Sequence, residues 1–282
     1  VRANFFITST PGLNTNYFHK NKKIKKYIHI CHSSMDVHVY QIFSFDNFDF
    51  ICCPTIHFQN NLIKLLKQRY GFCKPKIILT DLFYLNKKLT YKKESLNKNK
   101  PNLLTVAPTW GDDSLLYKIN EEFIHAIKKL ASKKKLIINF RPHPQTYISD
   151  KEKLNNIFKL FKKFKLNYCF DNQSDNFKSL FNSRILICDI SGVFSDYLIL
   201  NNNPKILVHG MKKKKRRLYE NHFLNEEKRF ELLFLKRKKC IFFNMEELVN
   251  RINSKNELKT IKIKKDFFKN KFGNNFLYNL IH

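Results

Sequence analysis

The chain alternates short apolar runs with longer amphipathic patterns along most of its 282 residues, and this alternation constrains the fold more than any other feature. The apolar runs have the length and composition of buried strands, whereas the amphipathic patterns have helical spacing. The expected strands cover residues 5–9, 27–31, 48–53, 76–80, 103–107, 136–140, 166–170, 185–188 and 205–208. The expected helices cover residues 35–45, 56–70, 121–131, 150–164, 174–181, 193–200, 246–253 and 265–281. This alternation predicts an α/β fold with parallel sheets and helices on both faces.

A lysine- and asparagine-rich stretch without apolar periodicity, residues 86–102, divides the alternation into two blocks. Its composition is typical of a linker. We therefore expect two Rossmann-like lobes whose parallel sheets face each other across a cleft, an N-terminal lobe over residues 1–95 and a C-terminal lobe over residues 103–245. Residues 246–282 are expected to form a helical segment that packs back on the lobes. The first lobe is the shorter one and begins close to a strand, which is compatible with an incomplete lobe.

Two polar segments follow expected strands and carry most of the chemistry. Arg141-Pro142-His143-Pro144 follows one buried run, and the residues 189–196, Asp-Ile-Ser-Gly-Val-Phe-Ser-Asp, follow another. The carboxyl ends of parallel strands are where open α/β sheets bind their ligands. The second segment also places small residues at the start of a helix, where free N–H groups suit a phosphate. Together the segments indicate an enzyme that acts on a phosphorylated or nucleotide-linked substrate.

The formal net charge of +30 comes from 53 basic residues, of which nine are Arg and the rest are Lys, against 23 acidic residues. Nucleic-acid readers rely on Arg for bidentate contacts, so an excess made of Lys is a weak sign of nucleic-acid binding. Abundant Lys, Asn, Ile and Phe are also typical of the codon bias of an AT-rich genome. The part of the positive charge that codon bias does not explain favours an anionic partner, either a membrane surface or a polyanionic polymer. A basic nucleic-acid-binding protein is a disfavoured alternative, because no motif of that class is recognisable.

The seven cysteines contain no C-x-x-C pair, and several lie in apolar strand-like runs. This usage favours buried thiols in a reducing cytoplasm. No apolar stretch approaches the roughly 20 residues that span a bilayer, and no signal peptide is recognisable. We therefore expect a protein that is soluble or peripheral to a membrane.

Several segments, taken in order along the chain, resemble one enzyme family. They are residues 10–13 (Thr-Pro-Gly-Leu), 27–33 (Tyr-Ile-His-Ile-Cys-His-Ser), 48–51 (Phe-Asp-Phe-Ile), 106–110 (Val-Ala-Pro-Thr-Trp), 141–144 and 189–197, with a trailing Pro204. Together they are similar to the CDP-glycerol glycerophosphotransferase family, which builds and primes teichoic-acid-like poly(glycerol phosphate) chains. The resemblance covers about residues 10–210. Two positions depart from the usual pattern, because Ser33 stands where Gly usually follows His32, and Gly192 stands where a second Ser is usual.

The resemblance implies a GT-B fold, in which the C-terminal lobe holds a nucleotide donor and the acceptor approaches from the N-terminal lobe. It implies transfer of glycerol phosphate, or a related polyol phosphate, from CDP-glycerol to a hydroxyl of a surface-polymer acceptor, with release of CMP. Such a transfer depends on positioning and charge neutralisation. No obligatory cofactor is implied, and CDP-glycerol enters as the donor substrate. The alternative on the same fold is a sugar-nucleotide-dependent glycosyltransferase or a UDP-sugar 2-epimerase-like enzyme of capsule or surface polysaccharide synthesis.

Two histidines are the candidate catalytic residues. His32 is the candidate general base, because an imidazole can take a hydroxyl proton near neutral pH; the alternative is a structural hydrogen bond in a loop. Arg141 and His143 are expected to face the donor pyrophosphate, Arg141 as a forked donor and His143 as a hydrogen-bond donor or acid to the leaving phosphate. The alternative is a proline-stiffened turn with both side chains solvated.

The start of the helix at 193–200 supplies the other donor-binding candidates. Ser191 and the amide of Gly192 are expected to hold the donor phosphates, since glycine permits close backbone approach. Helix capping by Ser191 is a compatible role. Asp189 either contacts the donor or orients its loop. Asp196 either meets a ribose or glycerol hydroxyl or is a first-turn charge that the helix dipole favours.

Trp110 is a further candidate for donor or substrate contact. Its neighbours Asp112 and Asp113 are interpreted as helix caps, and no metal site is predicted, since no His, Cys or Asp cluster has metal-ligand spacing.

The densest basic run follows the expected strand 205–208 and comprises Lys212, Lys213, Lys214, Lys215, Arg216 and Arg217. This run is either a solvated loop or a patch for an anionic membrane or polymer, where each basic residue near the surface contributes about 1 kcal/mol. We therefore expect a cytoplasmic enzyme peripheral to the inner face of the plasma membrane. Its expected partners are a nucleotide-linked donor and a lipid-linked or polymer acceptor, without nucleic acid.

Overall fold

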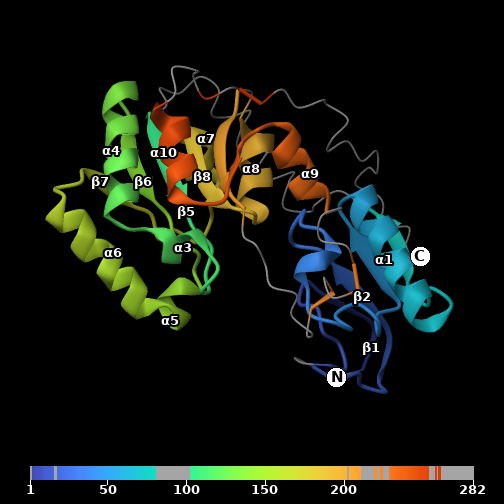
Figure 1. The fold of residues 1–282 in the computed structure, drawn as a ribbon. Coiled ribbons are helices and arrows are strands. Elements are labelled where there is room, and N and C mark those ends of the chain that lie inside the picture. Colours follow the sequence, from blue (N-terminus) through green and yellow to red (C-terminus); the bar gives the residue numbers. More distant parts are fainter. Residues whose placement is uncertain are drawn as a thin grey trace. The chain divides into compact units, whose positions relative to one another are not determined.

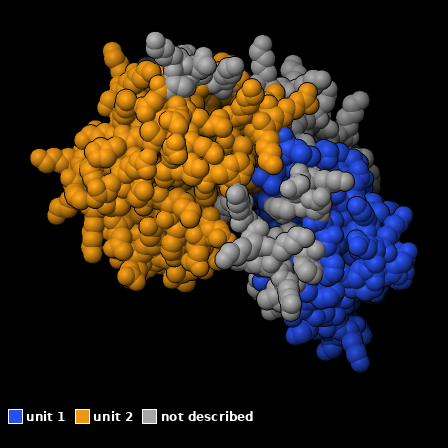
Figure 2. Space-filling view, viewed as in Figure 1, with its two compact units in different colours: residues 1–87, 214–233, 264–282 blue, residues 88–213, 234–263 orange. Residues whose placement is uncertain are grey.

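A computed structural model describes residues 2–15, 18–80, 102–201, 203–210, 219–220, 223–224, 229–253, 258 and 260–261. The chain divides into two compact units (Figures 1 and 2). Unit 1 comprises residues 1–87, 214–233 and 264–282, and unit 2 comprises residues 88–213 and 234–263. The predicted linker, except for its last residue, and the predicted helix 265–281 lie outside the described residues.

Unit 1 contains a four-stranded parallel sheet. Its strands are β1 (Ala3–Thr8), β2 (Ile24–Ile30), β3 (Phe50–Cys53) and β4 (Lys76–Leu79), and they lie in the order β1-β2-β3-β4. Each neighbouring pair is parallel. Four expected strands are thus confirmed in type, with ends that differ from the expected ones by at most three residues.

The helix α1 (Ile56–Tyr70) packs on the sheet of unit 1, and both of its ends are signalled in the sequence. The side chain of Thr55 accepts a hydrogen bond from the amide of Phe58, and Gly71 closes the helix with a φ of 78°. Glycine adopts this left-handed conformation at little cost, which is why it commonly ends helices. One face of α1 carries buried residues at helical spacing: Phe58, Leu62, Leu65 and Leu66.

The predicted helix 35–45 is wrong. The structure has only a short 3-10 turn there, η1 (Val37–Val39), and Phe43 adopts a left-handed φ of 63°. Two backbone amides of this segment are bound by distant carboxylates, since the amide of Asp36 donates to Glu231 at 2.6 Å and the amide of Phe43 donates to Glu220 at 3.1 Å. A helix would need the Phe43 amide for its own ladder, so contacts with residues far along the chain override the local pattern.

The same two glutamates correct the predicted domain boundary. The predicted C-terminal lobe over residues 103–245 includes residues 214–233, yet these residues group with unit 1. Glu220 is fully buried there and pairs with Arg69 of α1 at 2.6 Å, while Leu224 joins the apolar core of that unit. These contacts are the physical reason why the chain returns to unit 1 after the last long strand of unit 2.

Unit 2 contains a six-stranded parallel sheet in the order β10-β9-β8-β5-β6-β7. Its strands are β5 (Leu103–Ala107), β6 (Ile137–Phe140), β7 (Tyr168–Phe170), β8 (Ser183–Asp189), β9 (Lys205–His209) and β10 (Ile241–Phe242). Starting from β5 in the centre, the chain first extends the sheet to one side and then returns to extend it to the other. This is the order of a doubly wound nucleotide-binding fold.

Helices cover both faces of this sheet (Figure 1). They are α3 (Leu115–Lys118), α4 (Glu121–Lys134), α5 (Thr146–Ser149), α6 (Lys151–Lys163), α7 (Phe177–Asn182), α8 (Gly192–Leu200) and α10 (Met245–Asn253). The helix α9 (Phe230–Arg237) is divided between the units, since its residues up to Leu233 group with unit 1 and those from Phe234 group with unit 2. α4, α6 and α10 share one hydrophobic core with β5, β6 and alternate residues of β8. The intervening residues of β8, Leu186 and Cys188, are also buried, and they face the side where α7 and α8 pack together. The predicted α/β architecture is confirmed.

Candidate functional site

The order of the strands in unit 2 locates the expected ligand-binding edge. β5 and β8 are neighbours, and the chain leaves them toward opposite sides of the sheet. Doubly wound sheets bind ligands outside the carboxyl ends of the two strands where the order reverses. The segment 108–114 follows β5, and Ser191 and Gly192 follow β8, so both segments flank this reversal point. Arg141 follows β6, the strand on the other side of β5.

The predicted donor-binding residue Asp189 links the two segments at the reversal point. Its carboxylate accepts hydrogen bonds from the amides of Thr109 and Leu115, each at 2.7 Å. His209 at the end of β9 lies 3.3 Å from the same carboxylate. Asp189 is fully buried, and these three partners occupy its oxygens. The placement favours the loop-orienting alternative for Asp189.

Trp110 lies on the loop that Asp189 holds. This side chain is 48% exposed, which leaves an aromatic face accessible at the edge of the sheet. The loop is also held on its other side, because the amide of Gly111 donates to Asp150 at 3.3 Å and the hydroxyl of Tyr117 donates to the same carboxylate at 2.7 Å. Trp110 is therefore presented by a loop with a fixed backbone. Among the described residues, no three His, Cys, Asp or Glu side chains are grouped so that they could hold a metal ion.

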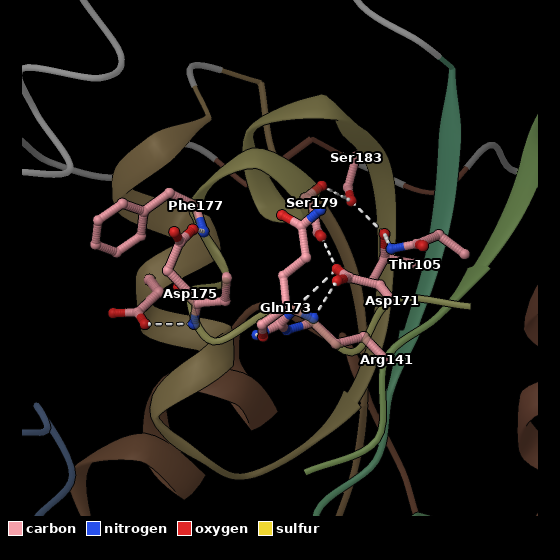
Figure 3. Close-up of polar contacts among 11 residues, drawn as sticks. Thr105, Arg141, Asp171, Gln173, Asp175, Phe177, Ser179 and Ser183 are labelled. Carbon is pink, nitrogen blue, oxygen red and sulfur yellow. Dashed lines mark hydrogen bonds and ion pairs between the residues drawn. The ribbon is translucent and has the colours of Figure 1, made fainter. Parts of the chain in front are cut away.

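Arg141 is buried, with 8% of the residue exposed, and its guanidinium is bound on two sides (Figure 3). Nη1 lies 2.8 Å from a carboxylate oxygen of Asp171, and Nη2 donates to the carbonyl of Gln173 at 2.9 Å. The predicted solvated alternative for Arg141 is therefore wrong. A guanidinium has five N–H groups, so these two contacts leave others for a ligand.

His143 differs from Arg141, because it is exposed. Its amide donates to the carbonyl of Pro108 at 3.1 Å, which ties the turn after β6 to the loop after β5. Its Nδ1 accepts a hydrogen bond from the amide of Gln145 at 3.1 Å. The hydrogen-bond pattern thus assigns the ring proton to Nε2, which becomes a donor toward solvent or ligand. Partial burial, and then the charge of Arg141, lower the pKa of His143 below its ordinary value. A neutral Nε2–H donor is the form that this environment favours.

Ser191 and Gly192 lie where the sequence predicts, at the first turn of α8. Ser191 occupies the N-cap position, but its side chain makes no capping hydrogen bond. Both residues are partly exposed. The amides of the first helical turn lack partners within the helix and carry partial positive charge, which suits an anionic group. Asp196 of the same helix is 6% exposed and accepts a hydrogen bond from Asn176 at 3.1 Å, so its carboxylate points into the protein.

The loop after β7 contains the residues that the sequence analysis missed. Asp171 binds Arg141, and Asn176 binds Asp196, so this loop joins the turn after β6 to α8. A usable signal was present, since Asp171 directly follows the expected strand 166–170 just as Arg141 follows 136–140. A carboxylate at one strand end beside an arginine at the next would suggest a pair, because parallel strand ends meet at one edge.

The candidate base His32 belongs to unit 1, where it follows β2. Its Nδ1 lies 3.0 Å from the carbonyl of Ser9, and the ring is exposed. A carbonyl can only accept, so Nδ1 carries the proton and Nε2 of the neutral ring holds a lone pair. His32 and His143 thus show opposite tautomers, the first with an exposed acceptor and the second with an exposed donor. An exposed acceptor suits the base that is predicted at position 32, and an exposed N–H group suits the hydrogen-bond donor to phosphate that is predicted at position 143.

His29, a residue of β2, is buried near His32. The ring of His29 contacts the rings of Phe45 and Phe48, with a centroid distance of 5.1 Å to each. Burial, and then the proximity of His32, lower the pKa of His29 to about 3, and a contact with the Thr10 backbone opposes this only in part. His29 is therefore neutral near pH 7 and adds no positive charge beside His32.

The basic run Lys212–Arg217 lies outside the described residues, so its role stays a prediction. Within the described part of the chain, none of the helices combines the length and the apolar character needed to cross a bilayer.

The sequence of the chain matches a known family over a range that contains the six-stranded sheet of unit 2. The match covers residues 83–261 and is to the CDP-glycerol:poly(glycerophosphate) glycerophosphotransferase family. The chain belongs to this family. It is therefore placed among the glycerophosphotransferase enzymes, as the resemblance implied. Arg141, His143, Ser191 and Gly192 lie inside the matched residues, whereas His32 lies outside them. No protein with a curated description matches the chain.

Solved structures with a similar fold support the GT-B architecture. The chain is similar to UDP-GlcNAc 2-epimerase from Methanocaldococcus jannaschii, with a TM-score of 0.52 and 14% identity over 91% of this chain and 70% of that chain. It is equally similar to a histidine-to-asparagine variant of the wall teichoic acid polymerase TagF, with a TM-score of 0.51 and 14% identity over 90% of this chain and 64% of that chain. The chain spans about two thirds of the length of these solved chains. At this identity the likeness shows the fold, and the GT-B prediction is confirmed.

Proposed function

We propose that the protein transfers glycerol phosphate, or a related polyol phosphate, from CDP-glycerol to a hydroxyl of a surface-polymer acceptor and releases CMP. In this step the acceptor oxygen forms a bond to the β-phosphorus, and the bond from that phosphorus to the oxygen of CMP breaks. The hydroxyl proton passes to Nε2 of His32. The observation that carries the proposal is the position of Arg141, His143 and the first turn of α8 at the reversal edge of a sheet that lies within the family match.

Three kinds of group in unit 2 meet the negative charge of the donor. Arg141 supplies a charged fork, His143 supplies a neutral Nε2–H donor, and the amides of α8 supply dipoles. Phosphoryl transfer gains most from such prepositioned groups, because charge on the phosphoryl oxygens develops in the transition state. Through these groups the protein neutralises the diphosphate with its own side chains and backbone.

The acceptor and the place of action follow from the proposed reaction. A growing polyol phosphate is itself an anion, and a lipid-linked acceptor requires access to a membrane surface. The net charge of +30 favours both partners. We propose that the enzyme works on the cytoplasmic face of the membrane as a peripheral protein.

A nucleotide screen separates this proposal from a sugar-nucleotide enzyme of the same fold. Thermal unfolding is followed with CDP-glycerol, CMP-sugars and UDP-sugars, each added at the same concentration. CDP-glycerol should raise the melting temperature most, because a ligand that binds only the folded state stabilises it by mass action. A shift with UDP-sugars and none with CDP-glycerol would reject the proposed donor.

A further inference from the structure

Asp171 is at the centre of a buried polar network in unit 2 (Figure 3). Its carboxylate pairs with Arg141 at 2.8 Å and accepts hydrogen bonds from the amide of Gln173 at 3.1 Å and from the hydroxyl of Ser179. The side chains of Arg141 and Asp171 are only 9% and 10% exposed. Charged groups at this depth retain their charges only when they are paired, so the two side chains hold each other in place.

The network continues into the interior of the sheet. The side chain of Asn139 on β6 donates to the hydroxyl of Thr105 on β5 at 3.2 Å, and that hydroxyl lies 2.5 Å from the hydroxyl of Ser183 on β8. Ser183 in turn donates to the carbonyl of Ser179 at 2.6 Å. Since the Ser183 hydroxyl donates its proton to the Ser179 carbonyl, the Thr105 hydroxyl is the donor to Ser183. Each side chain in this series therefore donates to the next, from Asn139 toward the carbonyl of Ser179. Ser179, and through it Asp171, is therefore anchored to three strands.

The anchored carboxylate limits how Arg141 can point. Asp171 holds Nη1 and the Gln173 carbonyl holds Nη2, so the plane of the guanidinium is set by two contacts on the loop after β7. Two such contacts could not fix the orientation of a lysine, because its ammonium group lacks the planar pair of nitrogens that a guanidinium has. A donor group that is fixed before the ligand arrives needs no reorganisation during reaction.

We propose that Asp171 is a positioning residue, which fixes Arg141 in the orientation where its remaining N–H groups meet the diphosphate of the donor. This inference rests on the proposed function, since the diphosphate is the ligand it invokes. It also assigns Asp171 and the carbonyl of Gln173, at the start of the loop after β7, to the support of the donor site.

The first test is the affinity for CDP-glycerol, measured by calorimetry on the full chain. Asp171→Asn keeps the shape and removes the charge, and it should weaken binding about tenfold, a size typical of coupling between contacting residues. Asp171→Glu restores the charge and should recover part of the loss. Ser179→Ala removes one partner of Asp171 and should weaken binding about threefold, within the range of one hydrogen bond. Asp175→Asn is the matched control on the same loop, because Asp175 is exposed and bonds only locally to the amide of Phe177; it should leave the affinity unchanged.

A double-mutant cycle decides whether Asp171 acts through Arg141. In the Arg141→Lys background, Asp171→Asn should add little further loss, since the fork that it positions is already gone. If the affinity losses of Asp171→Asn and Arg141→Lys add in the double variant, or if Asp171→Asn loses no more affinity than Asp175→Asn, the inference is overturned. Circular dichroism of each variant shows that the fold persists.

A second measurement is independent of the donor. The charge of Arg141 contributes to the lowered pKa of His143, and Asp171 offsets that charge. In the ligand-free protein, Asp171→Asn should lower the imidazole pKa of His143 further in an NMR titration, and Asp171→Glu should restore it. An unchanged titration would overturn the control of Arg141 by Asp171. If the unaltered protein binds no CDP-glycerol, the proposed function fails, and this titration still reports whether Asp171 offsets the charge of Arg141.

Discussion

Replacing Asp189 by alanine should destabilise unit 2 strongly, as expected from the second of its two predicted roles, the orientation of its loop. The carboxylate holds the amides of Thr109 and Leu115 at 2.7 Å and lies 3.3 Å from His209. The alanine variant leaves two amides without an acceptor, and a buried unsatisfied donor costs about 1–3 kcal/mol. Taking about 2 kcal/mol for each amide gives a loss of about 4 kcal/mol in the free energy of unfolding. For a unit of this size that loss corresponds to a fall of about 10 °C in melting temperature.

Two assays check this value. Urea unfolding gives the loss of free energy, and hydrogen exchange of the Thr109 and Leu115 amides shows whether the loop itself is released. Asp175→Ala is the control, because this exposed aspartate accepts one local hydrogen bond at 3.1 Å, and it should cost less than about 1 kcal/mol. A loss for Asp189→Ala no greater than that of the control, with unchanged exchange of both amides, would refute the assignment of Asp189 as the anchor of the loop after β5.

Three further predictions concern other parts of the molecule. Gly71→Ala should lower the free energy of unfolding by about 1 kcal/mol in urea unfolding, because Gly71 has a left-handed φ of 78°. An added Cβ would meet no atom within 4 Å, so backbone strain is the whole of the expected effect. An unchanged stability would contradict the strain argument. Burial raises the pKa of Glu220 to about 7, despite the opposing charge of Arg69. Because this pKa lies above that of the unfolded chain, the folded protein binds the proton more tightly, and its stability falls as the pH rises and the proton is lost. Between pH 5 and pH 8 the native protein should therefore lose stability relative to Glu220→Gln in urea unfolding, and an equal pH dependence of the two proteins would reject the raised pKa. His143→Gln should retain more activity than His143→Ala, because an amide can donate a hydrogen bond as Nε2–H does. His32→Gln should lose as much activity as His32→Ala, because an amide cannot take a proton. If glutamine retained the same share of activity at position 32 as at position 143, the two assigned tautomers would be contradicted.

The alternation of apolar runs and helical patterns predicts most of the strands, because the central runs, those of β5 and β8, are buried on both faces of a parallel sheet. The sequence also locates α1 from Thr55 to Gly71, since both ends are signalled by local residues. It fails at 35–45, where the partners that decide the backbone are Glu220 and Glu231. No local pattern contains contacts of that sequence separation.

The candidate site shows the same division between local and distant information. Arg141, His143, Ser191 and Gly192 are found from their position after apolar runs, and the structure places all four at the carboxyl edge of one sheet. The burial of Asp189 could not be read from the sequence, because the groups that bind it are backbone amides of another strand's loop. The ion pair of Asp171 with Arg141 was within reach of the sequence, since each residue directly follows an expected strand.

The central claim is that the protein transfers glycerol phosphate with His32 and His143 in the roles assigned above. Release of CMP from CDP-glycerol, in the presence of a lipid-linked acceptor, tests this most directly. The unaltered protein should release CMP, and His32→Ala and His143→Ala should each reduce the rate at least a hundredfold while the fold persists. Full activity in both variants, or no CMP from the unaltered protein, would contradict the account.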